Sequence, residues 1–236
     1  MQFNSPKAVF WRGFIDGLPF VLVVVPFALL FGVVATGAGL NIVETMTMTI
    51  LVVAGAAQFT ALALLQEEAP TFIVLLTALA VNLRMAMYSA ALVPHLGKAS
   101  MGMRMVMSYF MVDQSFAIAA RKYEETPGMP LPHKIIYYFA CLLPIVPLWY
   151  LCSYVGARLG AAIPPEYSLD FAIPSCFIAL TAPMMRSLPH FLAALVSIIG
   201  ALALAWVPYS LGLIIAAIFA MAVGAEVERR LQGDAA

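Results

Sequence analysis

The segment Thr77–Leu92, TALAVNLRMAMYSAAL, is apolar almost throughout, yet it carries Asn82 and Arg84 near its middle. About ten residues of helix, or about 15 Å, separate the Arg84 guanidinium from water on either side. An arginine at this depth costs roughly 3 kcal/mol on insertion scales and more than ~10 kcal/mol in simulations of an isolated helix. Arg84 must therefore face protein or water, and a partner must accept its hydrogen bonds.

The composition identifies lipid as the solvent of this chain. Of its 236 residues, 64% are hydrophobic and 10% are charged, whereas a soluble domain carries about 25% charged residues. A membrane-spanning helix needs about 20 apolar residues, and the sequence offers several such runs in series. We therefore predict an all-α, polytopic integral membrane bundle that forms a single transmembrane transporter domain over residues 1–236. The formal net charge of zero gives no indication of a nucleic-acid partner.

Charged and Pro/Gly-rich breaks divide the chain into eight predicted spans, residues 17–39, 46–65, 71–94, 103–121, 135–157, 169–185, 189–206 and 209–226. The count is seven if one span is re-entrant or if the last two form a single broken helix. With the N-terminus in the cytoplasm, most basic residues outside the spans lie on the inner side, as the positive-inside rule requires. Lys98 and Arg104 are exceptions, because the third-to-fourth connection falls on the outer side in this topology.

Six prolines interrupt three of the predicted spans: Pro19 and Pro26, Pro144 and Pro147, Pro174 and Pro183. Each proline removes a backbone donor and frees a carbonyl that lipid cannot satisfy. A single proline is more often a packing kink. Secondary transporters, however, use broken helices to bind substrate near the midplane. Six prolines in three spans favour functional helix breaks.

Four polar residues lie at similar depth in three consecutive predicted spans: Gln58, Asn82, Arg84 and Asp113. Asp113 is the acid within the hydrophobic zone and therefore the expected partner of Arg84. Thr77, Arg84 and Tyr88 share one helix face, while Asn82 lies about 200° round the helix. Either this helix is enclosed on two faces, or its backbone loosens near Asn82. Each group alone could be a structural hydrogen bond, but together they favour a polar site through which a solute passes.

Other chemistries lack their motifs. His95, His133 and His190 fall at predicted span ends, so no histidine cluster lies within the membrane. The three cysteines have no metal-ligand spacing, and we interpret them as buried and inert. No HExxH, GxSxG or Walker sequence occurs. We therefore expect neither an enzyme nor a bound metal or cofactor.

The run AGAAQFTALALL at residues 54–65, followed by LAVNLRMAMYSAALVPHLGK at residues 79–98, resembles the AzlC family, the large subunits of branched-chain amino acid exporters. The opening GFIDGLPFVLVVVPFALLFGVVATGAGL is also similar to that family, and the resemblance is strongest from Gly13 to Ala120. It implies a multi-pass protein of the bacterial cytoplasmic membrane. It further implies export of hydrophobic amino acids such as valine, together with a small AzlD-type membrane subunit.

The resemblance also implies a set of site residues. The substrate-binding positions that match the family motifs are Gln58, Phe59, Asn82, Arg84, Tyr88 and Ser89, and the coupling positions are Asp113 and Gln114. The chain departs from the family pattern at two positions. Members often have His where this chain has Met85, and Glu where it has Gln114. These departures bear on the substrate and on the coupling role.

Our mechanistic hypothesis is the export of an apolar zwitterion. Arg84, or a helix N-terminus freed by a proline break, attracts its carboxylate. Gln58, Asn82 and freed carbonyls hold its ammonium, and Asp113 alternates between pairing with Arg84 and carrying a proton. The rival hypothesis is a non-transporting scaffold or assembly subunit in which Arg84 and Asp113 form a structural pair. A nonselective channel is disfavoured, because the spans lack rings of repeated charge.

Overall fold

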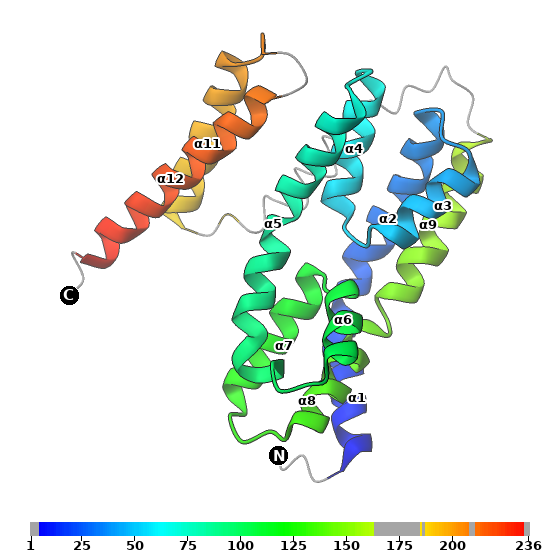
Figure 1. Cartoon of the computed structure of the whole chain (residues 1–236), viewed down its shortest axis with the longest axis vertical. Helices are drawn as coiled ribbons and strands as arrows, with labels where there is room; N and C mark the ends of the chain where they lie inside the picture. The colour runs from blue at the N-terminus through cyan, green and yellow to red at the C-terminus, as the bar shows by residue number, and fades with distance from the viewer. Residues whose placement is uncertain (1–4, 163–184, 186, 208–210, 234–236) are drawn as a thin grey trace. The chain divides into compact units, whose positions relative to one another are not determined.

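A computed structural model of the chain describes residues 5–162, 185, 187–207 and 211–233. All regular secondary structure in these ranges is helical (Figure 1), which confirms the predicted all-α membrane class. The described residues contain four stretches long and apolar enough to cross a bilayer: Pro6–Gly37, Thr71–Leu96, Leu131–Gly160 and Leu211–Leu231. The predicted span 169–185, with Pro174 and Pro183, falls outside the described residues except for Met185.

The chain divides into two compact units. The first holds Met1–Leu62 and Ala78–Ile173, and the second holds Ala63–Thr77 and Pro174–Ala236. In the second unit, α11 (Leu188–Ala203) and α12 (Leu211–Gly233) form an antiparallel pair, in which Gly200 faces Ala216 and Gly224 faces Ala193. The polar residues with which the sequence analysis is concerned lie in the first unit, apart from Thr77.

The first unit contains two broken spans that pack against each other. The first consists of α1 (Pro6–Gly17), the 3₁₀ turn η1 (Leu18–Phe20) and α2 (Val21–Gly37). The second consists of α8 (Leu131–Leu142) and α9 (Val146–Gly160). The two spans run side by side in the same direction, with α1 on α8 and α2 on α9 (Figure 1).

Glycines allow these two spans to approach closely. A Cβ on Gly13 would lie 2.8 Å from the carbonyl oxygen of Tyr137, and one on Gly156 would collide with the carbonyl of Leu29. Without a hydrophobic drive between helices in lipid, small residues at the interface supply the packing. The breaks are also aligned, since a Cβ on Gly17 would lie 3.0 Å from Cγ of Pro144.

The prolines of these spans have unequal effects. Pro19 lies in η1, Pro144 lies in the turn between α8 and α9, and Pro147 lies in the first turn of α9, so breaks occur near all three. Pro26 is different, because α2 continues through it without interruption. One missing backbone bond near the start of a helix need not end it where neighbouring helices pack against it. The break predicted at Pro26 is therefore wrong.

The second predicted span is two short helices that fold back on each other. α3 (Ile42–Leu51) is followed by Val52, whose backbone is extended, and α4 (Gly55–Gln66) begins three residues after Val52. The Gln58 side chain donates from Nε2 to the carbonyl of Met48 at 3.2 Å. In a continuous helix these two residues would lie about 15 Å apart. The chain therefore reverses at residues 52–54.

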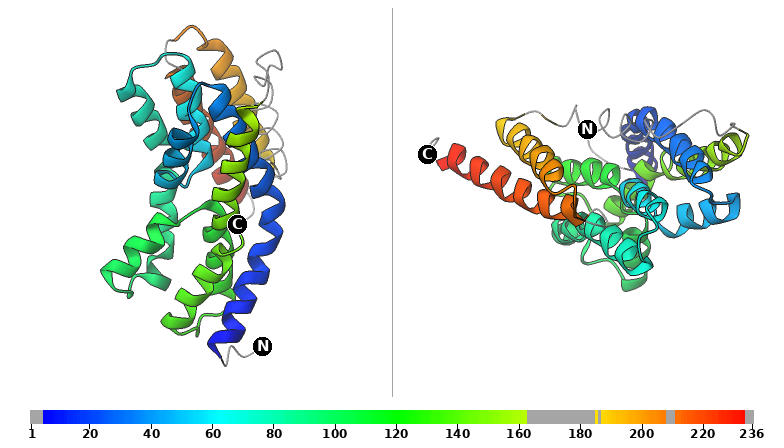
Figure 2. Two further views of the ribbon diagram at one scale, coloured as in Figure 1. Left: turned by 90° about the vertical axis from the view of Figure 1, so that its right-hand side faces the viewer. Right: turned by 90° about the horizontal axis from the view of Figure 1, so that it is seen from above.

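The fourth predicted span has the same construction. α6 (Met101–Tyr109) and α7 (Asp113–Glu125) are separated by an extended Val112. One hydroxyl, that of Tyr138, donates to the carbonyl of Met107 at 2.9 Å and lies 3.5 Å from Ser115 Oγ. Figures 1 and 2 show the α3–α4 hairpin in the half of the first unit that contains α2 and the α6–α7 hairpin in the half that contains α1. The two hairpins enter this unit from opposite ends.

These hairpins change the predicted topology. α5 (Thr71–Leu96) ends beside the start of α8, since His95 Nδ1 lies 3.3 Å from Lys134 Nζ. The connection to α6 therefore lies at the end of the unit where α1 begins, together with Lys98 and Arg104. Their predicted outer placement is wrong, because α6–α7 is re-entrant and does not cross. The correction removes the exceptions to the positive-inside rule and supports a cytoplasmic N-terminus.

Candidate functional site

Arg84 occupies the centre of α5, a helix of 26 residues, as the sequence predicted. Its Nη1 forms an ion pair with Oδ2 of Asp113 at 3.1 Å. The Arg84 side chain is 33% exposed and that of Asp113 is 43% exposed. Because a charge pair facing hydrocarbon would be costly, the open side of this pair must face water or another polypeptide.

Asp113 lies at the tip of a hairpin. The sequence analysis assigned it to the interior of a continuous span, but it is the first residue of α7, directly after the extended Val112. The first turn of a helix carries unpaired N–H groups and a partial positive charge, which stabilise a carboxylate. The start of α7 therefore adds favourable partial charges to the contact that Asp113 makes with Arg84.

Tyr88 completes the group around Asp113. It lies one turn after Arg84 on the same face of α5, and its hydroxyl lies close to the Asp113 carboxylate. The Tyr88 ring stacks on Phe116 of α7, with ring centroids 4.2 Å apart and planes inclined by 8°. The predicted residues Arg84, Tyr88 and Asp113 are thus brought together, with an aromatic wall beside the charges.

Several buried polar atoms near these positions lack a hydrogen-bond partner within the described part of the chain. They are Arg84 Nε, Asp113 Oδ1, Asn82 Oδ1 and Gln58 Oε1. Three of these atoms are hydrogen-bond acceptors, and the fourth, Arg84 Nε, is a donor on a cation. A buried polar atom without a partner costs about 1–3 kcal/mol. Arg84 Nε and Asp113 Oδ1, which belong to one ion pair, are therefore suited to a ligand that brings a carboxylate and an ammonium group.

The other predicted site residues have separate surroundings. Gln58 is fully buried and caps the break in α3 through Met48, so its amide group has a structural role as well as a free oxygen. Phe59 packs in an aromatic cluster with Phe27 and Phe31, at centroid distances of 4.9 Å and 5.5 Å. Gln58 therefore contacts α3 and Phe59 contacts α2, and neither of these contacts involves the ion pair.

Asn82, Ser89 and Gln114 are partly buried. Asn82 lies on α5, which is an uninterrupted helix, so its backbone does not loosen there. Gln114 follows Asp113 in the first turn of α7. Met85 packs against the apolar cluster that includes Leu92 and Tyr138. The substrate-binding role of Asn82 and Ser89 and the coupling role of Gln114 stay predictions.

Tyr109 is a functional candidate that the sequence reasoning missed. It is the last residue of α6, at the same hairpin tip as Asp113. Its hydroxyl donates to the carbonyl of Ile50 near the end of α3 and lies 3.3 Å from the hydroxyl of Tyr150 on α9. A tyrosine carries no insertion penalty, so only the positions of the two helix breaks could have identified it.

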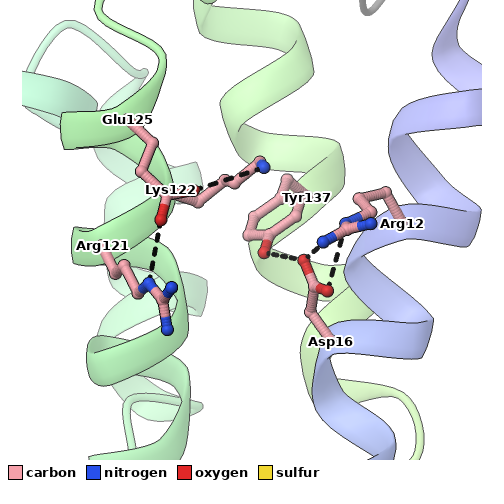
Figure 3. Close-up of polar contacts among 6 residues, drawn as sticks. All are labelled: Arg12, Asp16, Arg121, Lys122, Glu125 and Tyr137. Carbon is pink, nitrogen blue, oxygen red and sulfur yellow. Dashed lines mark hydrogen bonds and ion pairs between the residues drawn. The ribbon is translucent and has the colours of Figure 1, made fainter. Parts of the chain in front are cut away.

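Asp16 is a second residue that the sequence reasoning missed. Its Oδ2 accepts from Tyr137 at 2.6 Å and from Arg12 Nε at 3.1 Å, which joins α1 to α8 (Figure 3). The sequence reasoning began the first span at Gly17 and so left Asp16 outside it.

Figure 3 also shows Arg121 and Glu125 of α7, whose 2.9 Å hydrogen bond lowers the pKa of the Glu125 carboxyl.

Among the described residues, the other titratable groups do not form a cluster that suggests a reaction centre. Lys134 is buried beside His95, and the buried Tyr123 donates to the Lys134 carbonyl at 2.8 Å. Cys141 and Cys152 are free and buried, as predicted, and Cys176 lies outside the described residues. No group of three or more His, Cys, Asp or Glu side chains among the described residues could hold a metal ion.

Comparison with known proteins gives a family match over the region that contains these residues. The family described as AzlC protein matches residues 19–163. Inner membrane protein YgaZ of Escherichia coli (strain K12) is 26% identical over 207 residues, covering 84% of this chain and 81% of the relative. An uncharacterized membrane protein of Archaeoglobus fulgidus is 27% identical over 210 residues, covering 87% and 88%. No solved structure matches.

Proposed function

The chain belongs to the AzlC family, and on that premise we propose that it is a secondary transporter that exports hydrophobic amino acids of the valine type from the cytoplasm. The open ion pair between Arg84 and Asp113 carries this proposal. A scaffold would bury such a pair in dry contacts or replace it with apolar side chains, because an isolated buried pair is weak evidence for stability. A partly exposed pair at the centre of a membrane helix is instead suited to meeting a solute.

The pair can exchange with a zwitterion without leaving a charge unpaired. The substrate carboxylate replaces Asp113 on Arg84, and the substrate ammonium replaces Arg84 on Asp113. Both states are neutral overall, so neither leaves a buried uncompensated charge. The free Oδ1 of Asp113 supplies a further acceptor for the ammonium. Tyr88 and Phe116 offer an apolar surface for the substrate side chain.

The proposal includes the cellular setting that the family implies. The chain would act in the bacterial cytoplasmic membrane with a small AzlD-type membrane subunit, as a transporter rather than an enzyme. The name of the Escherichia coli relative, inner membrane protein YgaZ, supports that location. The open side of the Arg84–Asp113 pair supports a further polypeptide or a water-filled passage beside α5.

Asp113 is the proposed site of proton coupling. Asp113 contacts Arg84 in the closed pair, so we expect a proton to reach its carboxylate only when the pair separates. In the exchange described above the substrate ammonium then holds Asp113, so the proton binds after the substrate has left and before the pair forms again. Efflux of valine from loaded cells should therefore slow when the proton gradient is collapsed. Efflux that is unchanged by collapse would rule out coupling.

Efflux measurements on substituted proteins test the transport proposal. Cells with the chain, with and without its neighbouring small-subunit gene, are loaded with candidate amino acids, and loss of label is followed. Arg84→Lys and Asp113→Asn should each lower the rate about tenfold or more, because a point charge cannot replace the fork of a guanidinium and an amide cannot balance it. Arg104→Lys, a charge-conserving change outside the pair, is the matched control and should transport normally.

Protein in the membrane fraction is measured in the same cells. If Arg84→Lys and Asp113→Asn are present at normal levels but do not transport, the pair has a functional role. If both variants disappear from the membrane while Arg104→Lys remains, the pair is a structural strut and the scaffold hypothesis holds.

A further inference from the structure

The two hairpins meet at a single tyrosine. Tyr109, at the end of α6, bonds to Ile50 at the end of α3, and these residues lie at the tips of hairpins that enter the first unit from opposite ends. The same hydroxyl lies 3.3 Å from that of Tyr150 on α9, the second half of the broken α8–α9 span. One hydroxyl therefore joins both hairpin tips and the wall beside them.

The break that follows α3 explains why the Ile50 carbonyl accepts this hydrogen bond. The extended backbone at Val52 removes the regular helical donor that the Ile50 carbonyl would have in a continuous helix. Inside a membrane, a carbonyl without a donor is costly, because no water is present to replace it. The Tyr109 hydroxyl supplies the missing donor. The closed contact is thus favoured by more than packing alone.

Asp113 lies on the same tip as Tyr109. Phe110, Met111 and Val112 are the only residues between them in the chain, so the tip is short. When a substrate separates Asp113 from Arg84, the start of α7 loses its ion pair with α5 and keeps the stack of Phe116 on Tyr88. A displacement of that start is carried directly to the end of α6, and the Tyr109 contact lies at that end.

We propose that Tyr109 is the positioning residue of a gate, whose hydroxyl holds the two hairpin tips together and closes the route between the two sides while the Arg84–Asp113 pair is intact. This inference rests on the proposed transport function and adds the element that keeps the passage closed. Loss of the hydroxyl lowers the free energy of the open state relative to the closed one. One neutral hydrogen bond corresponds to about a two- to tenfold change in that equilibrium.

Chemical accessibility tests the gate. Met111, buried and two residues after Tyr109, is replaced by Cys as a reporter, and a membrane-impermeant maleimide is added to intact cells. The chain without the reporter gives the background from its own cysteines, of which Cys141 and Cys152 are buried. Adding Tyr109→Phe, which keeps the ring, should raise the labelling rate of Met111→Cys about two- to tenfold.

Tyr154→Phe is the matched control. Tyr154 lies one turn after Tyr150 on α9, is exposed, and makes no hydrogen bond within the described residues. Its loss of a hydroxyl should leave labelling unchanged. Tyr150→Phe removes the second contact only and should raise labelling less than Tyr109→Phe. Tyr150→Phe also tests the gate if Tyr109→Phe fails to accumulate in the membrane.

Labelling requires no substrate, so it separates the gate from the transport proposal. Unchanged labelling in Tyr109→Phe, with normal protein levels, overturns the gate and leaves the transport proposal standing. If Tyr109→Phe lowers only the melting temperature in detergent, the bond is structural and the gate is again overturned. Raised labelling in a chain that exports no amino acid supports the gate and overturns the proposed substrate class.

Discussion

Tyr88 shows how a single side chain connects the charges to the apolar part of the site. Its ring lies flat against Phe116, while its hydroxyl reaches the carboxylate that pairs with Arg84. A phenol in this position can donate to Asp113 whether or not Arg84 is engaged elsewhere. The residue therefore bears on the stability of the separated state, in which Asp113 has lost its cation.

Tyr88→Phe should weaken transport without removing the protein. The variant keeps the stack on Phe116 and loses one hydrogen bond to a charged group, which is worth about 1.5 kcal/mol or less at a partly exposed site. The concentration for half-maximal efflux should rise about three- to tenfold, with normal protein in the membrane. Tyr154→Phe is the control, and equal kinetics for the two variants would exclude Tyr88 from the site.

The sequence predicted the Arg84–Asp113 pair because both charges lie where lipid would penalise them. It did not predict which way Gln58 points, since an amide can equally well cap a helix break or bind a ligand. Asp16 escaped notice because the first span was predicted to begin at Gly17, whereas α1 begins at Pro6. Tyr109 could not be found at all, because its role depends on two backbone reversals that its own residue type does not signal.

At the scale of elements, the main difference between the predicted spans and the structure is that two spans break without a proline. Hydropathy cannot distinguish one span of about 20 residues from two apolar half-helices joined by a few extended residues. Weak signals exist, namely β-branched residues at Val52 and Val112, which favour extended backbone. Asn41 and Glu44 form a capping box, and Ser100 caps α6, so two helix starts were readable. The reversals themselves were not.

The close packing of α2 against α9 gives a prediction about stability. Gly156→Ala should lower the melting temperature of the purified protein, because its new Cβ would meet the backbone carbonyl of Leu29, which cannot move aside. Overpacking of this kind costs about 1–3 kcal/mol. For a chain of this size that corresponds to a decrease of about 2–12 °C.

Gly37→Ala is the matched control for Gly156→Ala. Gly37 ends α2, and a Cβ there would meet nothing within 4 Å. Replacing glycine by alanine at an open helical position is neutral or slightly stabilising. If both variants melt at the same temperature as the unmodified protein, α2 and α9 are not held by the close approach described above.

At the scale of the whole molecule, the hairpins and the charges give the same topology. Half-helices of 9 to 13 residues extend about 14–20 Å, roughly half a bilayer, so each hairpin can enter and leave on one side. The first unit then has its basic residues gathered where α1 begins, including Lys7, Lys98 and Lys134, with Arg158 at the far end. An eight-span topology would place Lys98 and Arg158 on the same side.

Labelling of introduced cysteines distinguishes the two topologies. In intact cells, an impermeant maleimide should modify Arg158→Cys, at the exposed end of α9, and should leave Lys98→Cys unmodified until the membrane is permeabilised. The reason is that α5 crosses once and α6–α7 returns to the side it came from, so the loop holding Lys98 stays with the N-terminus. Modification of both cysteines from outside would mean that α6 and α7 cross as one span. In that case Tyr109 and Ile50 would no longer mark two opposed tips, and the gate would lose its geometric basis.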